Sequence, residues 1–493
     1  EKNAPIRAVI FTLLVTFLIF GSVCTFGFVR YDDPENIYAN PALNPPKWTE
    51  ILRTWSEPYE AMYIPVTYTA WGGIAQIAWT NNGMDARWFH LANLLLHALA
   101  AVLVYAILRE MKFADLAATL GALVFAIHPV QVEAVAWATG LKDVLSGCLG
   151  LAALWFYFLA RRKGLWIYFV GTILFALALL AKPGAAVVPA IALVVDWWLL
   201  RISWQRSLGW LGPWVGMALI VLLVARGVQP SVVHVPATQR IGIAGDALAF
   251  YLGHVAMPWN LAIDYGRSPQ WLVQQPIIWV NWLIPVVVGM VCWRFSRKAA
   301  WIALGVFVVA VLPVLGFSTF DFQQHSTVAD RYLYLAMLGV AMLAAMAVRR
   351  WPRNGTIVVC GLLVLYGYKT IRHEWAWGDS QRLFAQTLAV NPDSDIANNG
   401  IGVMLGNEAM QHYEPAKLQE GIIYLQRAVG SNPDSAGEHA NLATLYLLAG
   451  DKQRCEEELA VVRRLKPGLE RSEQMENLLN GKGKWFSAGM NSK

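Results

Sequence analysis

Long apolar blocks separated by short polar segments fill the first 372 residues of this 493-residue chain. Many are long enough to cross the roughly 30 Å hydrocarbon core of a bilayer. We therefore predict an all-α, polytopic membrane domain over residues 1–372. It has about eleven spans, at about 7–29, 88–108, 113–128, 141–160, 165–181, 184–200, 208–226, 277–293, 299–317, 331–349 and 354–371. The short apolar segment from Ala244 to Pro258 contains Asp246 and His254, so we expect it to be re-entrant or amphipathic.

A polar, helix-forming pattern replaces the apolar blocks over residues 373–493. Asn-Pro-Asp occurs at 391–393 and again at 432–434, and the step from Pro433 to Pro467 is 34 residues. That step is the tetratricopeptide period, in which each unit is a pair of packed helices. The step from Pro392 to Pro433 is 41 residues, so the first unit is expanded. We predict a short tetratricopeptide-repeat α-solenoid, used for protein or peptide recognition or as a structural cap.

The composition is typical of a polytopic membrane protein and excludes an ordinary soluble one. Hydrophobic residues make up 57% and charged residues 15% of the chain, whereas about a quarter of the residues in soluble domains are charged. The net charge of +6 needs no nucleic-acid partner, because cationic inner loops and contact with anionic membrane lipids account for it. The five cysteines are scattered, which favours neither a disulfide framework nor a metal site.

Basic residues gather in alternate loops, and such loops resist translocation across the membrane. If the N-terminus is inside, all of these clusters are cytoplasmic: Lys2 and Arg7, Arg109 and Lys112, Arg161 to Lys163, Arg201 and Arg206, Arg294 to Lys298, and Arg349 to Arg353. The loop 30–87 and the region after the last span are then outside. We expect the first span to be a retained helix rather than a cleaved signal peptide, since no small-residue cleavage motif is evident.

Two adjacent carboxylates stand where the chain first leaves the membrane. Asp32 and Asp33 follow the first apolar block and open a polar loop rich in Trp, Tyr and Pro. In this loop, residues 30–87, we expect short amphipathic helices that lie on the membrane. The position of the two carboxylates indicates the edge of an active site. The alternative is that they only end a helix or start a turn at Pro34.

Further ionisable residues border the spans on the same outer side, where charge is costly and retained charges are functional candidates. His128, Glu133 and Lys142 lie around the proline turn after the third span. Lys182 lies in the next outer loop, and Arg331 borders the tenth span.

This set of residues fits sugar transfer from a lipid phosphate. A carboxylate can take the proton of an attacking hydroxyl, and cations stabilise charge on a departing phosphate. The candidate catalytic residues are Asp32, Asp33 and Glu133. The candidate donor-phosphate ligands are Lys142, Lys182, Arg331 and His128. Each cation alone is equally compatible with an anchor whose head group reaches the interface.

The sequence requires no cofactor. His and Cys residues do not cluster with metal-ligand spacing, although a divalent cation bridging Asp32 or Asp33 with Glu133 is compatible with these residues. We expect His97, on an apolar span, to be a helix-packing histidine rather than a ligand.

Several motifs follow one another along nearly the whole chain. They are Tyr31-Asp32-Asp33, YIPVTYT at 63–69, WFHLANLLLHAL at 88–99, IHPVQVEAVAWATGLKDVLS at 127–146, AKPG at 181–184, DWWLLR at 196–201, FYLGHVAMPWNLAIDY at 250–265, DRYLYLAMLG at 330–339 and the repeats after WGDSQRLFAQTLAVNPD. In this order they resemble the transmembrane and tetratricopeptide repeat-containing protein family. That family is part of the C-type glycosyltransferase superfamily, which includes protein O-mannosyltransferases.

The resemblance implies a lipid-phosphate-linked sugar donor and an acceptor on the non-cytoplasmic face. It implies that an acidic residue of the first outer loop, here Asp32 or Asp33, is the catalytic base, and it supports Glu133 and His128 in the second outer loop. The array is short and its first unit is expanded, so we expect acceptor recognition to differ from that of longer relatives. Compact arrays of this kind favour a bacterial inner membrane with periplasmic repeats over the endoplasmic reticulum.

The leading hypothesis is a glycosyltransferase that moves one sugar, with mannose favoured, from a polyprenyl phosphate to a Ser or Thr of an exported protein. Transfer to a lipid or glycan is the enzymatic alternative. An inactive accessory or assembly subunit that binds a partner through its repeats is the non-enzymatic alternative. A transporter is disfavoured, because the membrane half shows neither an internal repeat nor paired broken helices.

Overall fold

The computed structural model of the chain describes residues 3–199, 201–229, 235–296, 299–468 and 474. Lys2, Arg297 and Lys298 of the predicted basic clusters lie outside these residues. The chain divides into two compact units. The first, here called the membrane unit, comprises Glu1–Phe28, Glu35–Leu261 and Arg267–Gly378. The second, here called the repeat unit, comprises Val29–Pro34, Ala262–Gly266 and Asp379–Lys493, so two loops from earlier in the chain belong to it.

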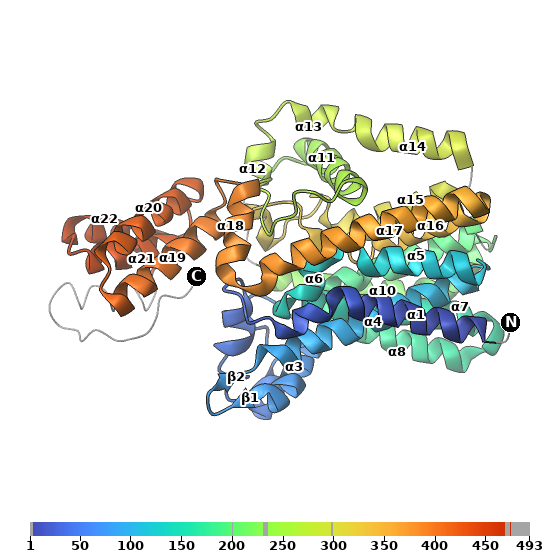
Figure 1. Ribbon diagram of the computed structural model, residues 1–493, viewed down its shortest axis with the longest axis horizontal. Helices are drawn as coiled ribbons and strands as arrows, with labels where there is room; N and C mark the ends of the chain where they lie inside the picture. Colours follow the sequence, from blue (N-terminus) through green and yellow to red (C-terminus); the bar gives the residue numbers. More distant parts are fainter. Residues whose placement is uncertain (1–2, 200, 230–234, 297–298, 469–473, 475–493) are drawn as a thin grey trace. The chain divides into compact units, whose positions relative to one another are not determined.

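The membrane unit contains the helices α1 to α17 and one two-stranded antiparallel ribbon (Figure 1). The helices are α1 (Ala4–Phe20), α2 (Trp48–Arg53), α3 (Pro65–Ala78), α4 (Ala86–Glu110), α5 (Asp115–Ile127), α6 (Val132–Ala136), α7 (Leu141–Lys163), α8 (Leu165–Ala181), α9 (Val188–Val194), α10 (Trp204–Val228), α11 (Ala237–Ala256), α12 (Pro269–Leu272), α13 (Ile277–Val280), α14 (Leu283–Ser296), α15 (Ala299–Val311), α16 (Met337–Arg350) and α17 (Pro352–Glu374). The ribbon pairs β1 (Trp79–Thr80) with β2 (Gly83–Met84).

Fewer helices are long enough to span a membrane than the sequence predicts. Among the described residues, six helical stretches are long and apolar enough to cross a membrane, or seven if a bent pair counts as one span. The six are Ala4–Thr25, Ala86–Glu110, Ala138–Lys163, Trp204–Val228, Ile277–Arg294 and Pro352–Gly378. Other predicted spans form shorter apolar helices, which are Leu165–Ala181, Pro183–Trp197 and Ala300–Val314. The predicted total of eleven is therefore not confirmed.

Prolines mark the ends of two of the shorter helices, because a proline lacks the N–H of a continuing helix and restricts the residue before it. Helix α5 ends at Ile127, just before His128-Pro129, and the stretch Pro129–Ala136 continues at an angle of 52°. Helix α8 likewise ends before Pro183. Helix α11, which contains the segment predicted to be re-entrant or amphipathic, is not among the six.

Small residues allow three helices of the membrane unit to pack closely. A Cβ at Gly121 of α5 would lie 2.6 Å from the carbonyl oxygen of Ala341 in α16. A Cβ at Gly339 of α16 would lie 2.5 Å from the carbonyl oxygen of Ala303 in α15. Small residues at such crossings let backbones approach where lipid gives no hydrophobic driving force between helices. The glycines therefore help to fix the order α5, α16, α15.

Contacts between basic clusters define one end of the membrane unit, here called the basic end. Arg162 at the end of α7 pairs with Glu110 at the end of α4. The guanidinium of Arg349 lies 5.8 Å from the ring centre of Phe113, which follows α4. Arg161 also pairs with Asp196, and the carbonyl oxygen of Asp196 accepts a hydrogen bond from the amide of Ile202, which is next to Arg201. These contacts link four of the predicted basic clusters.

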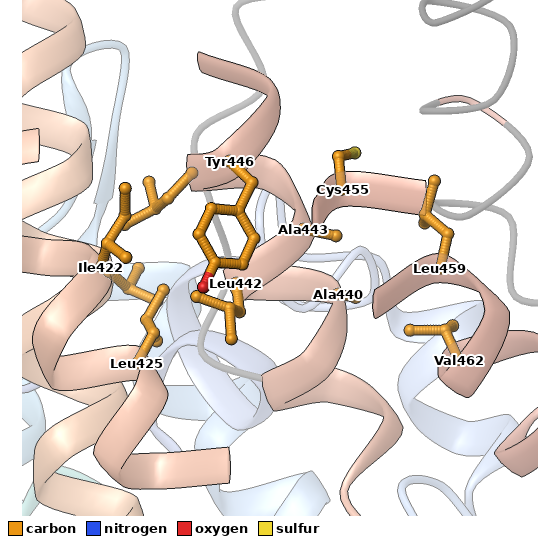
Figure 2. Packing of buried hydrophobic residues seen from close by; sticks show 11 residues of the cluster. Ile422, Leu425, Ala440, Leu442, Ala443, Tyr446, Cys455, Leu459 and Val462 are labelled. Carbon is orange, nitrogen blue, oxygen red and sulfur yellow. The ribbon is translucent and has the colours of Figure 1, made fainter. Parts of the chain in front are cut away.

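Over its described residues, the repeat unit has five helices that pack in chain order. They are α18 (Ser380–Val390), α19 (Asp395–His412), α20 (Pro415–Ser431), α21 (Ala436–Leu448) and α22 (Lys452–Leu465). Figure 2 shows Leu442 and Tyr446 of α21 between side chains of α20 and of α22 in a buried apolar cluster. This cluster gives α20, α21 and α22 a common core.

Equivalent contacts recur in this unit 41 residues apart. The side chain of Ser394 accepts a hydrogen bond from the amide of Ala397 at the start of α19, and Ser435 does the same for Glu438 at the start of α21. The Nδ2 group of Asn398 donates to the carbonyl oxygen of Pro392 at 3.0 Å. The Nε2 of His439 makes the corresponding 3.0 Å contact with Pro433. The two Asn-Pro-Asp segments therefore begin helical hairpins that are built alike.

Candidate functional site

A buried ion pair joins two of the predicted site residues in the membrane unit. Glu133 lies on α6, and Arg331 lies on a 3₁₀ turn, Asp330–Leu333. One carboxylate oxygen of Glu133 accepts a hydrogen bond from the backbone amide of Arg331 at 2.8 Å, and the other pairs with the Arg331 guanidinium. The two side chains are 2% and 6% exposed. Both oxygens of Glu133 are thus engaged in holding Arg331.

Aromatic rings surround the Arg331 guanidinium. Its central carbon lies 4.2 Å from the ring centre of Phe322, 5.0 Å from that of Tyr332 and 5.7 Å from that of Trp137. Trp137 also lies 4.5 Å from the ammonium group of Lys142. Cation–π attraction places these cations without taking up all of their hydrogen-bond donors.

The third predicted cation joins the same group of side chains. Lys182, in the turn that follows α8, pairs with Asp143 in the first turn of α7. Its ammonium group lies 5.7 Å from the ring centre of Tyr332. The other carboxylate oxygen of Asp143, Oδ2, is buried and has no hydrogen-bond partner within the described part of the chain.

Seven side chains therefore form one connected set, which we call the cation cluster. Its members are Glu133, Trp137, Lys142, Asp143, Lys182, Arg331 and Tyr332. Three cations face two carboxylates in the set, so its formal charge is +1. A group with this charge and a dry, aromatic lining is suited to a phosphate monoanion, because ionic contacts strengthen where water is excluded.

Asp32 and Asp33 lie in the repeat unit, on the loop Val29–Pro34. Asp33 is fully buried, and its Oδ2 accepts a hydrogen bond from the amide of Val29 at 2.9 Å. Asp32 is only partly buried and has a positive φ of 59°. Asp is among the few residues that adopt this conformation readily, because its short polar side chain can bond locally.

His128 has a different setting from the predicted cations. It is fully buried, its Nε2 contacts the carbonyl oxygen of Val255 at 3.0 Å, and its Nδ1 accepts from the amide of Val130 at 3.3 Å. Both ring nitrogens are thus bonded to the backbone, which leaves neither for a phosphate in this conformation. The contacts stabilise the turn between α5 and α6 that carries Glu133.

His97 is a packing residue, as the sequence predicts. It is fully buried on α4 between the hydroxyl of Tyr334 at 3.0 Å and the carbonyl oxygen of Ala126 at 2.8 Å. Over the described residues, no group of three or more His, Cys, Asp or Glu side chains is arranged to hold a metal ion.

Comparisons with known proteins add the family. Residues 71–228 match the family model described as dolichyl-phosphate-mannose-protein mannosyltransferase. Human protein O-mannosyl-transferase TMTC3 is 22% identical over an alignment that covers 90% of this chain and 53% of the human protein. The Drosophila melanogaster protein O-mannosyl-transferase Tmtc1 is 24% identical, with 87% of this chain and 62% of the fly protein covered.

The chain is similar to this protein O-mannosyltransferase-like family. It spans about half the length of the human relative. No solved structure matches the chain significantly. The matched segment 71–228 includes Glu133, Lys142 and Lys182.

Sequence reasoning did not find three members of the cation cluster. Trp137 looks like one more interfacial tryptophan, yet it is 1% exposed and lies between two cations. Asp143 and Tyr332 were not among the predicted site residues, although they directly follow Lys142 and Arg331 in the sequence. The available signal was the close spacing of Glu133, Trp137 and Lys142, since neighbours in this set are four or five positions apart.

Proposed function

We propose that this protein transfers mannose from a polyprenyl-phosphate donor to Ser or Thr side chains of an exported protein on the non-cytoplasmic face of the membrane. The observation that carries the proposal is the cation cluster, in which Arg331, Lys142 and Lys182 share the aromatic rings of Trp137 and Tyr332. Such a cluster is rare at membrane depth unless it binds something. The names of the family model and of the relatives supply the chemical class.

In the proposed reaction the acceptor hydroxyl oxygen attacks the anomeric carbon of the sugar. A bond forms between these two atoms, and the bond from the anomeric carbon to the phosphate oxygen breaks, so the configuration inverts. The hydroxyl proton goes to the carboxylate of Asp32 or Asp33. The polyprenyl phosphate leaves with the electron pair, and Arg331 with the two lysines stabilises its new charge.

Glu133 has a supporting role in this proposal rather than that of a base. Both of its oxygens bind Arg331, one through the guanidinium and one through the backbone amide. This arrangement orients the guanidinium before the donor arrives, and oriented charges are the ones that stabilise a transition state best. The buried, unpartnered Oδ2 of Asp143 is suited to accept a hydrogen bond from a sugar hydroxyl.

The repeats and the location complete the proposal. We assign the helical hairpins of the repeat unit to the tetratricopeptide class and propose that they bind the acceptor protein. The linked basic clusters at one end of the membrane unit support an orientation with that end in the cytoplasm. We further propose a bacterial inner membrane with the repeats in the periplasm.

An accessory subunit is the second candidate, and one observation favours it. Glu133 already neutralises Arg331, and Asp143 already neutralises Lys182. In a protein that no longer binds a donor, such pairs would be the resting arrangement of the cluster. In the proposed enzyme, a phosphate competes with these carboxylates for the cations.

The test is a transfer assay with purified protein, labelled polyprenyl-phosphate-mannose and exported host proteins. Asp33→Asn keeps an oxygen that can accept from the Val29 amide, and Asp32→Asn suits a positive φ, so both variants should fold. General-base catalysis contributes about 10²- to 10⁴-fold, so the variant that lacks the base should lose transfer by that factor. Donor binding without any transfer by the wild type would favour the accessory subunit.

A further inference from the structure

The loop that carries Asp32 and Asp33 belongs to the same compact unit as the helical repeats. The backbone amide of Arg30 donates to the side-chain oxygen of Ser380 at 2.8 Å. Ser380 is the first residue of α18, it is 8% exposed, and Asp379 caps the helix by accepting from the amide of Arg382. The start of α18 is therefore well defined, and Ser380 extends it to the loop.

A second loop meets the same helix at its other end. The Nδ2 group of Asn391, the residue after α18, donates to Oδ2 of Asp264 at 3.2 Å. Asp264 is 1% exposed, and its Oδ1 accepts from the amide of Gly266 at 2.8 Å, which closes a tight turn. Gly266 has a φ of +63°, and a Cβ there would lie 2.8 Å from Nδ2 of Asn391. Only glycine fits this turn without strain.

The contact between Asn391 and Asp264 copies a contact between the hairpins. Asn432 is the equivalent of Asn391 one unit later, and its Nδ2 donates to Oδ2 of Asp395 at 2.8 Å. In that case the carboxylate comes from the first residue of α19 in the preceding unit. At Asn391 no preceding unit exists in the array, and the turn Ala262–Gly266 supplies the carboxylate instead.

We propose that Asp264 and Ser380 are positioning residues. The turn Ala262–Gly266 caps the first unit of the array through Asp264, and α18, held in this way, fixes the loop Val29–Pro34 through Ser380. The repeats then do more than bind an acceptor, because they determine the conformation of the loop that carries the two candidate base carboxylates. The catalytic part of this inference rests on the proposed function, whereas the structural part does not.

Hydrogen exchange measured by mass spectrometry on the full-length protein in lipid nanodiscs tests the structural part without any substrate. Ser380→Ala removes the acceptor of the Arg30 amide, and Asn391→Ala removes the contact with Asp264. Both variants should speed exchange in the peptide that covers residues 29–34 by roughly three- to tenfold, the range expected for one lost hydrogen bond. Ser380→Thr retains a hydroxyl and should restore slow exchange.

Two matched substitutions supply the controls. Asn432→Ala removes the equivalent of Asn391 one unit later, and Ser435→Ala removes the side-chain cap of α21. They should leave exchange at residues 29–34 unchanged. The proposal would be overturned if exchange at residues 29–34 were the same in the wild type, Ser380→Ala and Asn391→Ala. It would also be overturned if the control variants accelerated this exchange equally.

Kinetics separate positioning from acceptor binding. If Ser380 positions the base, Ser380→Ala should lower kcat about tenfold with the KM for the acceptor unchanged. A rise in KM at constant kcat would show that α18 contributes only to acceptor binding and would overturn the catalytic part. If the wild type transfers no sugar, the proposed function fails, and the exchange experiment alone decides whether the repeats hold the loop.

Discussion

The two ends of α7 carry similar charged residues in opposite surroundings. Lys142 and Asp143 lie in its first turn, and Arg162 lies in its last turn, about 30 Å away at 1.5 Å per residue. At the last turn, Arg162 pairs with Glu110 and its side chain is 66% exposed. In the cluster that includes the first turn, Arg331 pairs with Glu133 and is 6% exposed. The distance of about 30 Å between the first and last turns of α7 is close to the thickness of a bilayer core.

The difference teaches what each end can do. An exposed ion pair is worth about 0 to 1 kcal/mol, so the pair of Arg162 with Glu110 contributes little energy. The basic end carries the charge pattern that orients a membrane protein. A buried pair costs several kcal/mol per ion in lost hydration. Apolar residues in place of the pair would often stabilise the fold equally well. The cation cluster is therefore better explained by binding than by stability.

The largest effect is expected from breaking the Glu133 and Arg331 pair on one side only. Arg331→Met leaves the Glu133 carboxylate buried without its guanidinium, which should lower the free energy of unfolding by about 3–5 kcal/mol. The double variant Glu133→Gln with Arg331→Met removes both charges and should recover most of that loss. Transfer should remain lost in both variants, because neither has the guanidinium. Thermal unfolding in detergent and the transfer assay measure the two effects.

Arg161→Met is the matched control at the basic end. Arg161 also pairs with a buried carboxylate, Asp196, and is 18% exposed. Its loss should destabilise the protein in a similar way while the folded fraction keeps its transfer activity. Recovery of transfer in the double variant at Glu133 and Arg331 would show that the pair is structural only.

The next effect concerns the two lysines of the cation cluster. Lys142→Met and Lys182→Met each remove one positive charge from the proposed phosphate site and should lower kcat/KM for the donor by roughly 10²-fold. Arg162→Met, at the exposed end of α7, should change it less than about threefold. Steady-state kinetics with varied donor concentration measure this comparison, and equal losses at both ends would remove the distinction between them.

A smaller effect should follow from changing the ring between Lys142 and Arg331. Trp137→Leu removes the aromatic face and should weaken donor binding by about 0.5–2 kcal/mol, the range of a cation–π contact. Trp137→Phe keeps an aromatic face and should lose less. Binding titrations of both variants with a polyprenyl phosphate check the order. The same loss in both variants would point to packing rather than to the ring face.

The smallest effect concerns an ion pair in the repeat unit, outside both ends of α7. The Glu458 carboxylate, which contacts His439 at 2.5 Å, raises the pKa of His439 above its ordinary 6.5. The added stability is therefore fully present below pH 6.5 and is lost as the pH rises through the raised pKa. His439→Gln should destabilise α21 and α22 by up to about 1 kcal/mol at pH 6 and by less at pH 8.5.

Limited proteolysis at the two pH values, with cleavage mapped to residues 436–465, measures the His439 effect. The glutamine side chain introduced by His439→Gln can still donate to the carbonyl oxygen of Pro433, so the comparison isolates the charge. A loss that grows between pH 6 and pH 8.5 would contradict the assigned direction of the pKa shift.

The sequence predicted the helical class, the family and the packing role of His97, because these depend on composition, motif order and apolar surroundings. Of the seven predicted site residues, Asp32 and Asp33 lie in the repeat unit and His128 binds the backbone. The structure brings the other four, Glu133, Lys142, Lys182 and Arg331, together. The reason is that charges at membrane depth are few, so those present tend to meet.

The remaining features depend on tertiary contacts that no local pattern shows. Pairing of Lys182 with Asp143 joins residues 39 positions apart, and Arg331 lies 198 positions from Glu133. The attachment of residues 29–34 and 262–266 to the repeats depends on single side chains, Ser380 and Asn391. The predicted count of eleven spans is not confirmed, because several of the predicted blocks form helices of fewer than 18 residues.

The most direct test of the account asks where the donor phosphate binds. A polyprenyl phosphate with a photoreactive group next to the phosphate would be crosslinked to the purified wild type and to Lys182→Met, and the labelled peptides would be mapped by mass spectrometry. We expect label in residues 133–143 and 330–334 of the wild type. The label should fall strongly in Lys182→Met and stay unchanged in the control variant Arg162→Met, which is treated in the same way. Label centred on residues 109–113 and 161–163, or label that Lys182→Met leaves unchanged, would contradict the account.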